Sequence, residues 1–70
     1  MVILWITNPN TREDIPIETF FTPQEALDRK DELRAEYPDI IFFYSVNALE
    51  VDNSELKPIN SVVEDIRDGL

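Results

Sequence analysis

The 70-residue sequence contains no cysteine, no histidine and only a single glycine. Without cysteine no disulfide can form, and without cysteine or histidine there is no zinc site of the usual kind. The side chains that perform most nucleophilic and acid–base chemistry near neutral pH are therefore missing, and the serines have no histidine to activate them. We expect no enzymatic activity, no catalytic residue, no metal site and no cofactor.

Positive charge is also scarce. Six Lys and Arg residues stand against fifteen Asp and Glu residues, which gives a net charge of −9. Nucleic acids and anionic membranes are polyanions, so neither is expected as a direct partner. If charge selects the partners of this chain, they are basic protein surfaces.

Long apolar runs are absent too. No run approaches the ~20 residues that are needed to cross a bilayer. The apolar start, Met1–Thr7, has no basic segment before it and no small-residue cleavage site after it, so we expect no signal peptide and a cytoplasmic location. Hydrophobic residues nevertheless make up 43% of the chain, which is too many for a disordered acidic tail. The sequence predicts one folded domain over residues 1–70.

Three segments have the composition of β-strands. Val2–Thr7 is β-branched or aromatic on both faces and uncharged, which is typical of a central strand. Ile15–Phe21 contains Pro16 and a charged residue, so it belongs at an edge. Ile40–Val46 is the third strand, and residues 48–51 are predicted to extend it past a bulge near 47.

The strongest helix signal follows the second strand. Thr22-Pro23-Gln24-Glu25 is a capping box with proline at the first helical position, and Phe21 and Ala26 occupy the positions of a hydrophobic staple. Pro38 is expected to end this helix. A second, shorter helix is predicted from Ser61, which begins another capping box, to Gly69.

These elements predict an α+β domain with the chain order β-β-α-β-α. The three-stranded antiparallel sheet has the order 2-1-3, because the uncharged first strand fits best in the centre. We expect the long helix to cover one face of the sheet and the short C-terminal helix to cover the other incompletely. Trp5, Phe20 and Phe43 are predicted to project from that second face, as a candidate interface between copies of the chain.

The candidate partner-binding residues are acidic and lie on the two predicted helices. Asp28, Glu32 and Glu36 follow one another at four-residue steps with Asp31 alongside, which places carboxylates roughly 6 Å apart. Each such like-charge pair costs about 0.2–0.5 kcal/mol, and Glu25–Arg29 is the one favourable pair at this spacing. The second helix adds Glu64, Asp65 and Asp68. Two interpretations stay open: a solvated helix face, or a row of anions held for a basic partner.

One stretch of sequence has a resemblance to a known group of proteins. It consists of an apolar-Pro-apolar strand, a capped helix start and an aromatic strand: Ile15-Pro16-Ile17, then Thr22-Pro23-Gln24-Glu25-Ala26-Leu27, then the third strand. This arrangement resembles small acidic phage-encoded inhibitors, such as the phage inhibitor of bacterial RNA polymerase and small anti-CRISPR proteins. The resemblance covers roughly residues 2–46, and the chain departs from it by a longer helix and an added acidic C-terminal segment. It implies an inhibitor that acts in the host cytoplasm, and it assigns no functional residue.

The leading functional hypothesis is a non-catalytic protein that mimics nucleic acid. Its acidic residues would occupy a basic, nucleic-acid-binding site on a larger protein complex. The alternative is a homodimer or larger assembly joined through the apolar sheet face. Salt distinguishes the two, because it weakens charge-driven binding and does not weaken apolar assembly.

Overall fold

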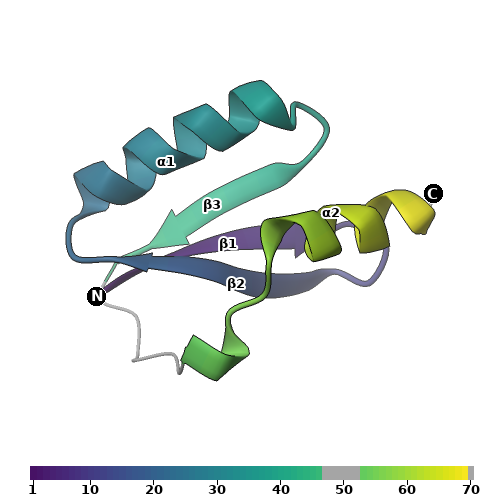
Figure 1. Cartoon of the computed structure of the whole chain (residues 1–70), viewed down its shortest axis with the longest axis horizontal. Helices are drawn as coiled ribbons and strands as arrows, with labels where there is room; N and C mark the ends of the chain where they lie inside the picture. Colours follow the sequence, from purple (N-terminus) through teal and green to yellow (C-terminus); the bar gives the residue numbers. More distant parts are fainter. Residues whose placement is uncertain (47–52, 70) are drawn as a thin grey trace.

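The β-sheet is antiparallel and has the strand order β2-β1-β3 (Figure 1). The structure, a computed structural model, describes residues 1–46 and 53–69. Within these ranges the strands are β1 (Val2–Asn8), β2 (Glu13–Phe20) and β3 (Ile41–Ser45). The predicted fold class and strand order are confirmed. The predicted extension of the third strand over 48–51 lies outside the described residues.

The long helix α1 (Pro23–Glu36) begins where its sequence predicts. Thr22 is extended, and its Oγ1 accepts a hydrogen bond from the backbone N–H of Glu25 at 3.3 Å, which satisfies one of the free N–H groups of the first turn. Tyr37 ends the helix just before Pro38, as expected. The predicted hydrophobic staple is wrong: Phe21 is 90% exposed and does not cover the buried Ala26.

The short helix α2 (Ile59–Asp68) follows a single turn of 3₁₀ helix, η1 (Asn53–Glu55). The predicted start at Ser61 is wrong, because Pro58 caps α2 without a side-chain hydrogen bond. The carbonyl of Pro58 accepts the N–H of Val62 at 3.2 Å and closes the first turn. Gly69 ends the helix as predicted, and its N–H donates to the carbonyl of Asp65.

Both helices pack on the same face of the sheet. One core cluster combines Leu33 of α1, Val62 and Ile66 of α2, and Leu4 and Ile6 of β1. The expectation that α2 covers the opposite face is therefore wrong. Three strands, each taking up about 4.8 Å, make a sheet roughly 14 Å wide, whereas one helix is about 10–12 Å across. Because α1 packs chiefly along β3, α2 fills the remaining part of the same face (Figure 1).

Contacts on either side of the start of α2 hold it at the β2 edge and beside α1. The N–H of Lys57 donates to the carbonyl of Pro16 at 3.1 Å, so the chain runs along the outer edge of β2 just before α2 begins. Tyr37, at the end of α1, then donates from its hydroxyl to Asn60 Oδ1 at 3.2 Å. The two helices are thus held beside one another above the sheet.

A β-bulge in β2 corrects a second expectation. The pairing of β1 with β2 shifts register between Leu4 and Trp5, and Ile17 is left as an extra residue without a partner. One extra residue reverses which face the following side chains occupy. Phe20 therefore lies opposite Val2 and packs against the helix-covered core, so its predicted place on the same face as Trp5 is wrong.

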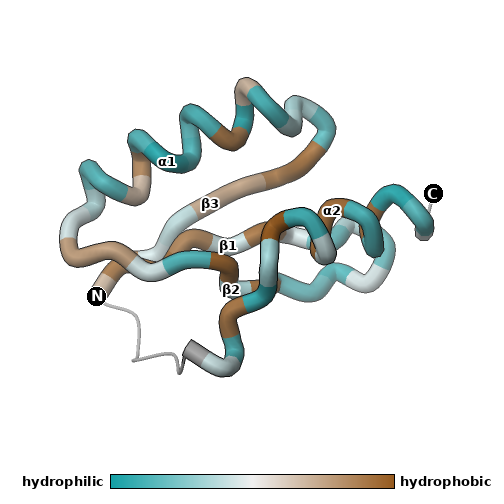
Figure 2. The backbone as a smooth tube through the Cα atoms, viewed as in Figure 1, coloured by the Kyte–Doolittle hydropathy of each residue, from teal (hydrophilic) through white to brown (hydrophobic). Residues whose placement is uncertain are grey.

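The hydropathy of the chain follows this layering. Figure 2 shows β3 as largely hydrophobic and α1 as mostly hydrophilic, with apolar residues recurring along one side. The buried residues of α1 are Ala26 and Leu33, and the rest of the helix is partly or fully exposed. Among the described helices, none is both long enough and apolar enough to cross a membrane.

Candidate functional site: an acidic surface on two helices

The shared packing face of α1 and α2 brings their solvent sides to the same side of the molecule. At about 100° per residue, most of the acidic residues lie opposite the buried stripe, whereas Glu36 and Asp65 lie beside it, each about 60° from a buried residue. Seven exposed carboxylates, all predicted from the sequence as partner-binding residues, make up what we call the acidic surface: Asp28, Asp31, Glu32, Glu36, Glu64, Asp65 and Asp68.

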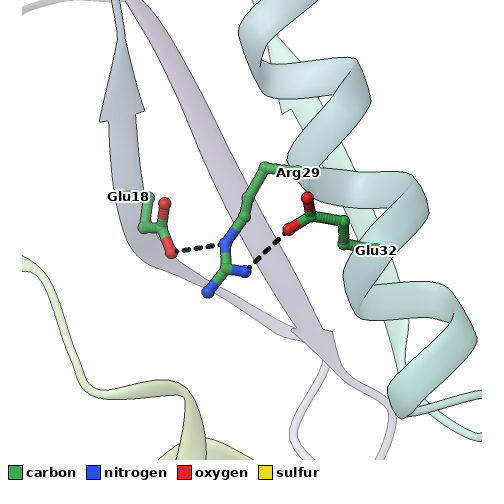
Figure 3. A network of polar contacts seen from close by, with 3 residues as sticks. All are labelled: Glu18, Arg29 and Glu32. Atoms are coloured by element: carbon green, nitrogen blue, oxygen red, sulfur yellow. Dashed lines mark hydrogen bonds and ion pairs between the residues drawn. The ribbon is translucent and has the colours of Figure 1, made fainter.

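Arg29 of α1 bridges strand β2 and the acidic surface (Figure 3). Arg29 Nε donates to Glu18 Oε1 of β2 at 3.0 Å, and its Nη1 donates to Glu32 Oε2 at 3.1 Å. These contacts, the Glu18 hydrogen bond first, raise the pKa of Arg29. The four-residue spacing predicts an ion pair between Arg29 and Glu25, but the long Arg29 side chain reaches across to the neighbouring strand instead. Arg29 is thus shared between a strand residue and one member of the acidic surface, Glu32.

The arginine of α2 pairs with a carboxylate that is not a member of the acidic surface. Arg67 donates to both carboxylate oxygens of Asp39, and its guanidinium lies 5.9 Å from the centre of the Tyr37 ring. The hydrogen bond from Arg67 lowers the pKa of Asp39, and the same bond raises the pKa of Arg67. This pair lies between α2 and the turn that follows α1, so it also fastens the helices together.

The acidic surface therefore keeps most of its charge. Within residues 1–46 and 53–69, Glu32 is the one member of the seven that forms an ion pair. Asp28 accepts a hydrogen bond from the neutral amide of Gln24 at 2.9 Å, which leaves its charge in place. In the same ranges no three acidic side chains converge as they would to hold a metal ion. The arrangement is suited to attracting cationic groups across a broad surface rather than to chelating one ion.

The opposite face of the sheet carries the aromatic candidate residues. The rings of Trp5 and Phe43 stack with their centroids 6.2 Å apart and an interplanar angle of 7°. Trp5 Nε1 donates to Ser45 Oγ at 2.9 Å, which satisfies the indole in its half-buried position. Beside them Ile41 is 54% exposed. Two of the three predicted interface residues thus lie together, and Phe20 lies on the other face.

The sequence contains a signal for the position of Phe20 but none for the contact between Arg29 and Glu18. Pro16 inside a strand pattern is a recognised mark of a bulge, and it could have moved Phe20 to the core. The Arg29–Glu18 contact joins two elements, so no spacing within the helix predicts it.

Comparison with known proteins adds no relative: the chain matches no protein-family model, no curated protein and no solved structure.

Proposed function

We propose that this protein is a non-catalytic binding protein whose acidic surface occupies a basic, nucleic-acid-binding site on a larger protein complex. One observation carries the proposal. The fold packs both acidic helices on one face of the sheet, and six of the seven carboxylates of the acidic surface form no ion pair within residues 1–46 and 53–69. The carboxylates are left outermost, as the anions of a nucleic acid are.

The physical basis is competition for the same cationic groups. A groove that binds phosphates attracts any rigid array of anions, and opposite net charge speeds the encounter. A helix holds its carboxylates at fixed spacing, so little conformational entropy is lost on binding compared with a disordered acidic tail. In this proposal the chain acts in the host cytoplasm as a phage-type inhibitor of a defence complex or a polymerase, in line with the resemblance of residues 2–46.

The proposal is tested by capture and competition. The immobilised protein is incubated at low salt with lysate of its native host, and bound proteins are eluted with duplex DNA or with an uncharged dextran as the control. We expect duplex DNA to elute a basic, nucleic-acid-binding protein that the dextran leaves bound. A captured partner that DNA does not displace at any concentration would contradict nucleic-acid mimicry.

A second candidate function is supported by the aromatic face of the sheet. No described helix covers Trp5 and Phe43, and the adjacent Ile41 is half exposed. In this alternative the chain is a homo-oligomer joined through that face, and its acidity serves solubility. Sedimentation across a range of salt distinguishes the candidates, because apolar self-association persists or strengthens as salt increases.

A further inference from the structure

The strand β3 lies at an edge of the sheet, and the two edges of the sheet differ. In the strand order β2-β1-β3, the described residues pair β3 with β1 on one side only. Edge strands are usually protected from further pairing by proline, charge or a covering segment. The edge at β2 has two of these protections, Pro16 and the backbone of Lys57 that bonds to it. The sequence of β3, Ile41–Ser45, contains neither proline nor charge.

A groove runs beside the β3 edge. It has a volume of about 390 Å³ and lies between the C-terminal half of α1 and the start of β3. Its lining combines cationic side chains of α1 with apolar residues of the turn and strand: Lys30, Arg34, Pro38, Ile40, Ile41 and Phe42. The groove therefore offers an extended chain both an open strand edge and positive charge.

The two cations of this groove stand out within so acidic a chain. Of the four cationic side chains that form no ion pair in the described parts of the chain, Lys30 and Arg34 lie one helical turn apart and both line the groove. Lys30 Nζ lies 5.6 Å from the centre of the Tyr44 ring, a cation–π contact that holds it over β3. The nearest acidic residue in sequence, Asp31, is exposed on the solvent side of α1. Two cations thus lie beside a strand edge to which the described residues add no further strand.

We propose that this groove binds an extended acidic segment of a partner protein, which adds to β3 as a fourth strand. Strand addition uses the backbone groups of the edge for affinity, and alternate side chains for specificity. The side chains of the segment on the helix side would be carboxylates that meet Lys30 and Arg34. Those on the other side would be apolar and continue the surface of Ile41 and Phe43.

The same charges disfavour a second copy of the chain at this edge. Antiparallel pairing of two β3 strands would bring the two grooves together, and Lys30 and Arg34 of each copy would lie near those of the other. Like charges so placed are repulsive. This site is also separate from the acidic surface, so either proposal can fail without the other.

The probe is a fluorescein-labelled peptide, Thr-Val-Glu-Val-Glu-Val-Thr, measured by fluorescence anisotropy with the full chain. We expect the double variant Lys30→Glu, Arg34→Glu to bind it at least about tenfold more weakly, because two attractive contacts become repulsive. The matched control, Arg12→Glu with Lys57→Glu, has the same net charge and should bind within about twofold of the wild type. Circular dichroism verifies that each variant is folded. Equal weakening in the two variants would overturn the proposal.

Strand addition itself is tested on the wild-type protein, so that folding of a variant does not enter. Two forms of the peptide are methylated on alternate backbone nitrogens. Only one set of N–H groups faces a neighbouring strand, so we expect one form to lose binding and the other to retain it. Equal binding of both forms would overturn the proposal. Absence of binding by the unmethylated peptide would also overturn it, and concentration-dependent dimerisation would then assign the edge to a second copy.

Discussion

Arg67 of α2 donates two hydrogen bonds to the carboxylate of Asp39, from Nε to Oδ2 at 3.1 Å and from Nη2 to Oδ1 at 3.0 Å. Asp39 lies in the turn between α1 and β3, so the pair joins the end of the chain to its middle. Such bidentate contacts fix orientation as well as distance. The contact helps to hold α2 on the same face of the sheet as α1. This placement brings the acidic residues of the two helices together in one surface.

This pair predicts a pH dependence. Arg67 lowers the pKa of Asp39 below its ordinary value of 3.8. A carboxyl whose pKa is depressed by folding contributes stability above its unfolded pKa, and that contribution is lost as the pH falls through the folded pKa. NMR titration of the Asp39 carboxyl should show the lowered pKa in the wild type and a return toward the ordinary value in Arg67→Met. An unchanged pKa in the variant would show that Arg67 is not the cause.

The two predicted helix caps give a matched pair of substitutions. Thr22→Ala should lower the free energy of unfolding by about 1 kcal/mol, because the hydrogen bond from Thr22 Oγ1 to the N–H of Glu25 is lost. Ser61→Ala, inside α2 rather than at its cap, should change it by no more than about 0.5 kcal/mol. Urea denaturation measures both. A larger effect at Ser61 than at Thr22 would refute the observed start of α2.

Neighbouring phenylalanines test the bulge in β2. Phe20 packs against the core, so Phe20→Ala should lower the free energy of unfolding by roughly 2 kcal/mol or more. Phe21 is 90% exposed, and Phe21→Ala should have an effect within about 0.5 kcal/mol. Strict alternation without the bulge would place Phe20 on the opposite face of the sheet. Equal effects of the two substitutions would therefore contradict the shifted register.

Local patterns predicted most of the fold, because they report local physics. The uncharged first strand, the Thr22 cap and the stop at Pro38 each depend on residues within a few positions, and each is confirmed. The face that α2 covers depends on its contacts with α1 and the turn after it, which no periodicity encodes. An amphipathic helix with one apolar stripe fits either face of a sheet equally well.

The candidate site also has features that the sequence predicts and features that it does not. Its acidic residues could be predicted one by one, since helical spacing places each of them outside the buried stripe. Their gathering on one side could not, because it follows from the packing of α2. The groove beside β3 could not be predicted from the sequence either, since Lys30 and Arg34 belong to a helix and Ile41 to a strand. Contacts between elements depend on how those elements are placed, and the sequence pattern leaves that open.

The central claim is that both helices present one surface to a basic partner. Two double variants test it. One combines Asp28→Lys with Glu36→Lys in α1, and the other combines Glu64→Lys with Asp68→Lys in α2. These residues form no ion pair in the described parts of the chain, so the fold should tolerate both variants. Glu13→Lys with Glu55→Lys is the control, since it makes the same change in net charge at exposed residues outside the acidic surface.

The decisive measurement is the affinity of these proteins for the captured partner as a function of salt concentration. We predict that each helix variant binds about 1–2 kcal/mol more weakly than the wild type, or roughly five- to thirtyfold, with a shallower dependence on salt. The control should retain the wild-type affinity and salt slope to within about twofold. If both helix variants bind the partner with the affinity and the salt slope of the wild type, the acidic surface is not the binding site.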